Sequence, residues 1–276
     1  MKNFLVLSLV LASTNALALN LQGYRFSDSY RYSILDDSLQ EKFAGKYVVT
    51  ASVGYVKNPL YYSDEQTATS RKVNIIHQNQ IATLGYSRYI NNELSLGLDA
   101  NYIMNDVYGK DYSGLGDTVA KARYNFYKKE EVSLSLNPQI FIPTGNKEAF
   151  TTTGSLGGSL SLVGEYAKEK WHFLASAGYF SANENKASVI DYRNLLTSQL
   201  GISYDANEKW NVNLEAVNTY STVGDNDQDE GDYYVTFKNK VKDTFSLNFG
   251  AGMAGVDEVN RDNYTLFAGI KFHEIE

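Results

Sequence analysis

Charged and amide side chains at every second position are the residues of this sequence whose types and spacing could do chemistry. Lys121, Arg123 and Asn125 are separated by single residues, and Asn137 and Gln139 repeat that spacing further along the chain. In a β-strand, side chains two positions apart point to the same face. Rows of this kind place fixed charges and hydrogen-bonding groups along one surface, which is the chemistry of a polar, selective passage.

Catalytic chemistry finds little support in the residue inventory. The three histidines, His77, His172 and His273, lie far apart in the sequence, and we expect them at different rims of the fold. Neither a Gly-x-Ser-x-Gly elbow nor a metal-ligand spacing occurs. The absence of cysteine excludes disulfides and thiolate metal sites. We therefore predict a protein that is not an enzyme and that needs no cofactor.

One acidic stretch, residues 222–230, begins like a calcium loop. It carries three aspartates at alternate positions, Asp225, Asp227 and Asp229. However, Glu230 stands where the calcium motif needs Gly, and Thr236 stands where it needs Glu. The default interpretation is a solvated loop. The alternative is a loose divalent-cation site or a contact with cation-bridged lipopolysaccharide.

The elements that must position these residues are strands, because apolar and polar residues alternate from about residue 46 onward. Leu94, Leu96 and Leu98, for example, are separated by Ser95 and Gly97. A period of two is typical of a strand with one apolar face. We predict twelve strands, at residues 46–57, 78–90, 93–104, 115–127, 131–142, 154–166, 171–181, 194–206, 210–221, 231–240, 244–255 and 263–272.

The predicted connections alternate between short turns and longer polar loops. The short turns fall at residues 91–92, 128–130, 167–170, 207–209 and 241–243. The longer loops fall at residues 58–77, 105–114, 143–153, 182–193, 222–230 and 256–262. This is the organisation of an outer-membrane barrel, with short periplasmic turns, longer extracellular loops and an even strand number. Aromatic residues near both sets of connections, such as Tyr89 and Trp171 beside short turns, fit interfacial girdles.

The predicted fold class is therefore all-β: a transmembrane antiparallel up-and-down β-barrel of twelve strands. Beyond the first 18 positions no apolar run approaches the roughly 20 residues of a membrane helix. The formal net charge of −7 disfavours nucleic acid as a partner. A soluble β-sandwich would also alternate, but its polar face would carry more Lys and Glu than the Ser, Gly and Asn found here.

The first 45 residues do not alternate and divide into two parts. Residues 1–18 have a lysine, an apolar core and a small-x-small end, which predicts a signal peptide cut after Ala18. Export without cysteine fits the outer membrane of a Gram-negative bacterium. Residues 19–45 are expected as a periplasmic N-terminal segment or a plug of the lumen, with a short helix over 33–43; a loosely ordered tail is the alternative. Residues 46–276 form the barrel.

The inward faces of the predicted strands give the candidate site. The predicted pore-lining residues are Asp99, Lys121, Arg123, Asn125, Asn137, Gln139, Glu165, Glu215 and Lys238. Inward cations and anions balance, which favours an interior that satisfies its own charges; a weakly selective polar pore is the alternative. Small inward residues such as Gly85 and Gly97 favour open space in the lumen.

Two stretches carry a resemblance to a known family. The sequences GLGDT at residues 114–118 and LSLNPQIFIPTGN at residues 134–146 resemble the outer-membrane barrels named for the meta-pathway of phenol degradation. The resemblance implies a barrel that takes up small organic molecules. Residues 30–39 also resemble the leader of barrels that precede an OmpA-type domain, which we expect to be absent here. One departure is that Phe272, the expected terminal aromatic, is followed by four more residues.

These observations predict a channel for passive transport of small solutes, with hydrophobic or aromatic compounds implied by the resemblance. The alternative is a non-conducting structural or surface-interaction barrel that acts through its extracellular loops. The expected partners are outer-membrane lipid, lipopolysaccharide, the barrel-assembly machinery and small solutes. The sequence leaves the oligomeric state open.

Overall fold

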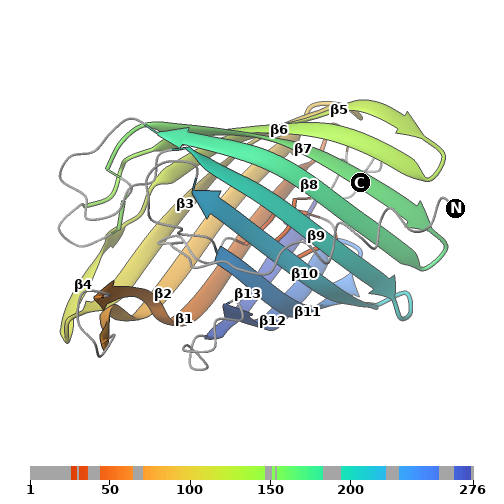
Figure 1. The fold of residues 1–276 in the computed structure, drawn as a ribbon. Coiled ribbons are helices and arrows are strands. Elements are labelled where there is room, and N and C mark those ends of the chain that lie inside the picture. Colours follow the sequence, from red (N-terminus) through yellow and green to blue (C-terminus); the bar gives the residue numbers. More distant parts are fainter. Residues whose placement is uncertain are drawn as a thin grey trace, which may run out of the picture.

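A computed structural model of the chain shows strands that cross the molecule obliquely and close into a barrel (Figure 1). The structure describes residues 26–29, 31–36, 44–64, 71–146, 151–152, 154–182, 194–221, 230–254 and 264–274. The expected signal peptide and the acidic stretch with Asp225, Asp227 and Asp229 lie outside the described residues.

The barrel wall is antiparallel throughout, and neighbours in sequence are neighbours in space. The elements are β1 (Tyr47–Asp64), β2 (Arg71–Tyr89), β3 (Leu94–Val107), β4 (Lys110–Leu115), β5 (Thr118–Lys129), β6 (Val132–Ile142), β7 (Gly157–Lys168), β8 (Trp171–Ala182), β9 (Leu195–Asp205), β10 (Trp210–Ser221), β11 (Glu230–Lys242), β12 (Phe245–Ala254) and β13 (Tyr264–His273). Pairing of β1 with β13 and of β2 with β3 closes the sheet.

The predicted twelve-strand barrel is confirmed, because β4 and β5 together occupy one position in the ring. Both elements pair with β3: β4 beside Tyr102–Val107, and β5 beside Leu94–Asp99. The predicted loop 105–114 is wrong, since β3 and β4 form a hairpin there. Its turn contains Tyr108 and Gly109, with φ of 51° and 76°. Two left-handed residues are the requirement of a tight hairpin turn.

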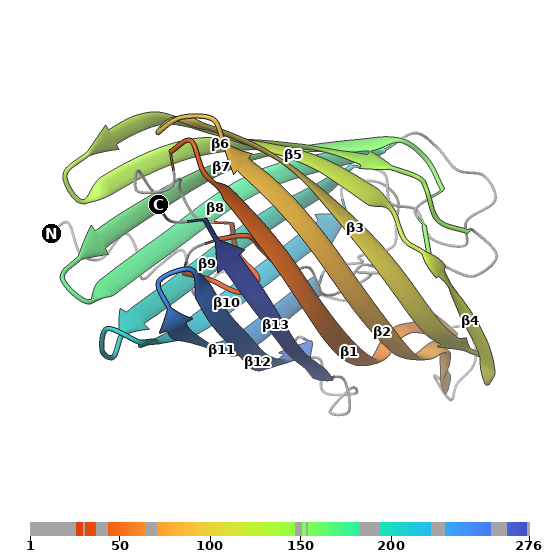
Figure 2. The same cartoon turned by 180° about the vertical axis from the view of Figure 1, so that it is seen from behind.

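The other connections follow the predicted alternation, with different bounds. Short turns join β5 to β6, β7 to β8 and β9 to β10 at the end of the barrel where β13 ends (Figures 1 and 2). The predicted loop 58–77 is too long, because β1 continues to Asp64 and β2 begins at Arg71. The predicted strand 154–166 instead begins at Gly157.

The two faces of the wall differ as the alternation predicts. Val53 and Leu98 face outward and are 61% and 53% exposed, whereas their neighbours Ser52 and Asp99 are buried. An apolar outer band of this kind suits hydrocarbon contact. Tyr89 departs from the predicted girdle: it is 1% exposed and points inward. Within the described residues, no helix is long and apolar enough to span a membrane.

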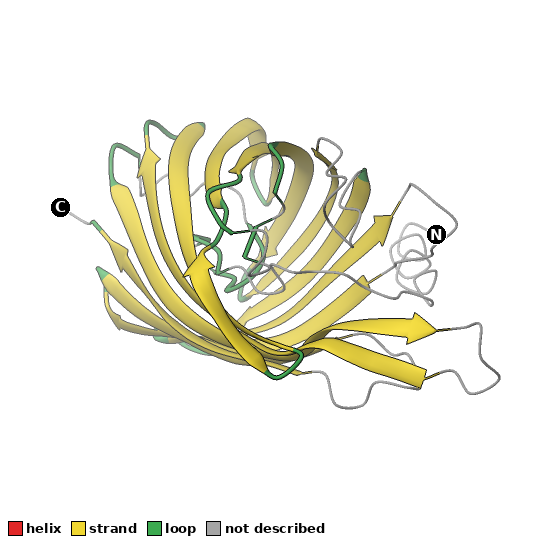
Figure 3. Ribbon diagram, turned by 90° about the vertical axis from the view of Figure 1, so that its left-hand side faces the viewer, coloured by secondary structure: helices red, strands yellow, loops and turns green. Residues whose placement is uncertain are grey.

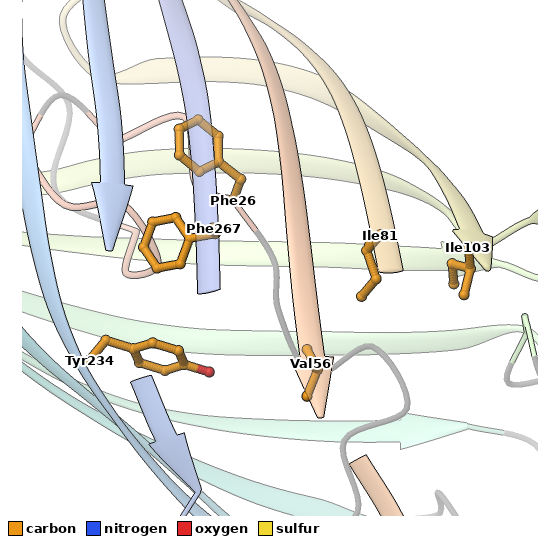
Figure 4. Packing of buried hydrophobic residues seen from close by; sticks show 6 residues of the cluster. All are labelled: Phe26, Val56, Ile81, Ile103, Tyr234 and Phe267. Atoms are coloured by element: carbon orange, nitrogen blue, oxygen red, sulfur yellow. The ribbon is translucent and has the colours of Figure 1, made fainter. Parts of the chain in front are cut away.

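Residues 26–29 and 31–36, here called the inner segment, lie inside the barrel (Figure 3). Residues 33–35 form bends and residue 36 is irregular, so the expected helix is wrong over its described part, residues 33–36. The segment anchors two apolar clusters. One contains Phe26, Val56, Ile81, Ile103, Tyr234 and Phe267 (Figure 4). The other contains Tyr32, Leu35, Val163 and Leu174.

Candidate functional site in the barrel interior

Two cations of β5 and an amide of β6 form what we call the basic side of the interior, namely Lys121, Arg123 and Gln139. Lys121 donates from Nζ to both carboxylate oxygens of Asp99 at 2.8 and 2.9 Å. Its Nζ also lies 3.4 Å from Oδ2 of Asp28. Strict alternation along β5 places both cations on the inward face, where they are buried.

The basic side binds two carboxylates of the inner segment. Arg123 Nη2 donates to Asp28 Oδ1, and it lies 3.3 Å from Asp36 Oδ1. Gln139 Nε2 donates to the other oxygen of Asp36 at 3.3 Å. Ser87 of β2 donates its hydroxyl proton to Asp28. Donors from three strands of the wall therefore converge on two acidic side chains of the inner segment.

Three carboxylates of β7, β9 and β10 form the acidic side, namely Glu165, Asp205 and Glu215. Strands β5 and β10 are five steps apart in the ring, so Arg123 and Glu215 lie on opposite parts of the wall. Glu215 accepts hydrogen bonds from the backbone N–H groups of Ser33, Ile34 and Leu35 at 3.0, 2.9 and 2.9 Å. The Thr236 hydroxyl donates to the same carboxylate at 2.6 Å.

A smaller ionic cluster lies on the acidic side next to Glu215. Arg31 Nη1 donates to Asp205 at 2.9 and 3.1 Å, and Arg31 Nε lies 4.0 Å from Glu165. The His172 ring stands between the same carboxylates, 3.9 Å from Glu165 and 3.5 Å from Asp205. The inner segment thus presents carboxylates to the basic side, and a guanidinium and backbone N–H groups to the acidic side.

Strand β13 supplies a third attachment of the inner segment. Lys271 donates from Nζ to the backbone carbonyls of Ser29 and Tyr32 at 2.8 and 2.6 Å. The same ammonium lies 4.7 Å from the centre of the Phe26 ring, within the range of a cation–π contact. A Cβ at Gly269 would lie 2.7 Å from that ring, so the glycine makes the approach possible.

The structure places all nine predicted pore-lining side chains on the inward face. Asn125, Asn137 and Lys238 are buried on β5, β6 and β11, and Gln139 is half-buried. The expectation of open space is wrong at Gly85 and Gly97. A Cβ at Gly85 would meet Thr50 and Asp99, and one at Gly97 would meet Ser87 and Lys121. Whether the nine residues line a conducting pore stays a prediction.

Sequence reasoning missed the partners that the inner segment supplies, above all Asp28, Arg31 and Asp36. The segment reads FSDS at 26–29 and RYSILD at 31–36, so it mixes aromatic residues with charges of both signs. That mixture was the available signal that this segment binds charged partners. It has no period of two, and nothing in it indicates which strands it meets.

The two motifs of the family resemblance meet at the break between β4 and β5. Thr144 donates its hydroxyl proton to the Gly116 carbonyl at 2.7 Å and accepts from the Thr118 N–H at 3.0 Å. Asp117 is buried and accepts a hydrogen bond from the Thr152 hydroxyl. Pairing with β3 shifts by one residue across this point, as in a β-bulge. The motifs therefore build a structural junction in the wall.

No group of three or more His, Asp or Glu side chains in the described part of the chain is arranged to hold a metal ion. The interior offers charges and hydrogen-bonding groups that can bind or guide a solute.

The closed barrel with its polar interior defines the class of protein: an outer-membrane β-barrel. The COG4313 outer membrane channel from Pseudomonas putida superposes with a TM-score of 0.67 at 13% identity, over 84% of this chain and 96% of that chain. The KdgM porin in complex with oligogalacturonate gives 0.53 at 10% identity, over 81% and 98%. The translocator domain of NalP from Neisseria meningitidis gives 0.50 at 10% identity, over 85% and 90%. At these identities the likeness shows the fold.

A family model gives the finer identification. The model described as "putative MetA-pathway of phenol degradation" matches residues 43–270, and the chain belongs to that family. The family expected from the GLGDT and PTG stretches is thereby confirmed. No curated protein matches the chain.

Proposed function

We propose that the protein is a non-enzymatic outer-membrane channel for passive transport of small solutes, and that the inner segment closes its lumen in the state described above. The observation that carries the proposal is the character of the attachment. Besides packing in the two apolar clusters, the segment is held by ion pairs and hydrogen bonds to the wall, through Arg123, Glu215 and Lys271. Such contacts can be exchanged for water or solute, unlike a continuous apolar core.

The barrel size supports the same proposal. Eight strands leave room for little beyond side chains, whereas sixteen or more leave an aqueous channel. A ring of twelve lies between these limits. It has space for one folded-back segment, and displacement of that segment would leave a narrow polar passage. The nine inward residues predicted from the sequence would line it.

The remaining parts of the proposal concern location and solute. Export by a cleaved signal peptide at residues 1–18 would deliver the chain to the outer membrane through the barrel-assembly machinery, and the outer band would contact lipid and lipopolysaccharide. The family description supports small hydrophobic or aromatic compounds as solutes. If no passage opens, the alternative function applies, namely a non-conducting barrel that acts through its extracellular loops.

Single-channel recording in a planar bilayer tests the proposal on the refolded chain from residue 19 onward. The informative variant is Gly201→Val, because a Cβ at Gly201 would lie 2.8 Å from both Leu35 Cδ1 and Tyr32 Cε1. The matched control is Gly178→Val, whose added atoms would meet Ser161 and Thr197 of the wall and not the inner segment.

We expect rare openings in the parent chain and in Gly178→Val, and long open times in Gly201→Val. Absence of conductance steps in all three proteins, with each shown to be folded by its heat-modifiable gel mobility, would contradict a channel function.

A further inference from the structure

We propose that the donors of the basic side form a binding site for small organic carboxylates, and that Asp28 and Asp36 occupy this site while the lumen is closed. The inference rests on the proposed channel function and names the class of solute. The inner segment then acts as an internal competitor for the solute site.

The donor set is the first argument. Two carboxylates of the inner segment, Asp28 and Asp36, are approached by donors from three different strands of the wall. These donors are the side chains of Arg123, Lys121, Gln139 and Ser87. A guanidinium fits a carboxylate better than any other side chain does, because its planar fork matches the two oxygens. The wall thus carries a carboxylate-binding site, which is occupied here by two side chains of the inner segment.

The difference between Lys121 and Arg123 ranks the two cations. Lys121 is bound in bidentate fashion by Asp99, a carboxylate of the wall itself. That partner stays in place when the inner segment moves. The carboxylates bound to Arg123 from Asp28 and Asp36 would leave together with the segment. Arg123 is therefore the main anchor for an incoming carboxylate, and Lys121 contributes less.

An apolar region next to the carboxylate site determines the rest of the solute. The Phe26 ring, two residues before Asp28, lies beside Phe267 (Figure 4) and belongs to the apolar cluster that also contains Val56 and Ile81. It also lies beneath the ammonium of Lys271. Displacement of the segment would vacate a ring-sized apolar space and an anion site close to each other. This combination suits aromatic acids better than cations or neutral sugars.

Equilibrium binding and conductance, measured on the same refolded chains from residue 19 onward, test the inference. The probes are benzoate and its neutral isostere benzamide, titrated by calorimetry in detergent micelles. Gly201→Val should displace the inner segment as a whole, because the added side chain meets Leu35 and Tyr32, and it leaves the wall donors Arg123, Lys121 and Gln139 in place. We expect this variant to bind benzoate at least about tenfold more tightly than the parent chain, since the competitor is removed. Benzamide should bind neither protein.

Variants on the basic side identify the anchor. In the Gly201→Val background, Arg123→Gln should weaken benzoate binding about tenfold or more, and Gln139→Leu should weaken it less. Gln139→Leu keeps the test available if Arg123→Gln does not fold. Equal binding of benzoate and benzamide, or benzoate affinity unchanged by both variants, would overturn the inference.

The outcomes separate this inference from the channel function. Potassium chloride conductance in Gly201→Val without benzoate binding would refute the carboxylate site and leave the channel intact. Benzoate binding that depends on Arg123, in a protein that never conducts, would support the site and refute the channel.

Discussion

The basic and acidic sides of the interior hold the same inner segment in different ways. On the basic side, Arg123 and Lys121 bind the side chains of Asp28 and Asp36. On the acidic side, Glu215 binds three consecutive backbone N–H groups. The first contact depends on which residues the segment carries, whereas the second depends on the shape of its backbone. Binding to β5 therefore depends on the charged side chains of the segment, whereas binding to β10 depends on the conformation of its backbone.

Reversing the charge of Arg123 should have the largest effect. Arg123→Glu would face Asp28 and Asp36 with a third carboxylate, and breaking a buried pair costs about 3–5 kcal/mol. The chain has no cysteine, so release of the segment can be followed as the alkylation rate of Ser33→Cys. We expect at least about a hundredfold acceleration. Adding Asp28→Arg should restore slow alkylation; failure of this charge swap would place the effect outside the pair.

Neutralising Glu215 should have an intermediate effect. Glu215→Gln keeps the size of the side chain and one acceptor oxygen, but it loses the charge on the acceptor, and a single hydrogen bond to a charged group is worth about 1.5–3 kcal/mol. Alkylation at Ser33→Cys should accelerate about 10- to 100-fold. The matched control is Glu131→Gln in an exposed turn, which should change nothing. Equal rates for the two variants would mean that Glu215 does not hold the segment.

The Arg31–Asp205 pair should matter least, although its N–O distance of 2.9 Å is short. The Asp205 side chain is 31% exposed, and pairs open to solvent contribute about 0–1 kcal/mol. Asp205→Asn should therefore change the alkylation rate by no more than about fivefold. Raising the salt concentration should produce a similar small change. A larger effect than that of Glu215→Gln would reverse the ranking of the two contacts on the acidic side.

Much of the wall could be predicted from the sequence because a strand places alternate residues on opposite faces. That rule identifies Asp99, Lys121 and Glu215 as inward without any knowledge of their partners. It fails where the chain leaves strict alternation. The β3–β4 hairpin turns at Tyr108 and Gly109, a pair without the usual Asn-Gly signal.

The inner segment could be anticipated only in outline. Its contacts join residues far apart in the chain, such as Arg31 with Asp205 and Ser29 with Lys271. No local pattern encodes such pairings, because each depends on how the closed barrel places its strands around the segment. The balance of inward charges did indicate an interior that pairs its own ions. It did not show that the N-terminal residues supply part of them.

The most direct test of the central claim is the alkylation rate of Ser33→Cys by a membrane-impermeant maleimide in the otherwise unchanged, folded protein. Ser33 is fully buried, whereas Asn92 lies in an exposed turn and provides the reference site as Asn92→Cys. If the inner segment is held between the two sides, Ser33→Cys should react at least about a hundredfold more slowly than Asn92→Cys, and the two should react alike in denaturant. Equal rates in the folded protein would contradict the account.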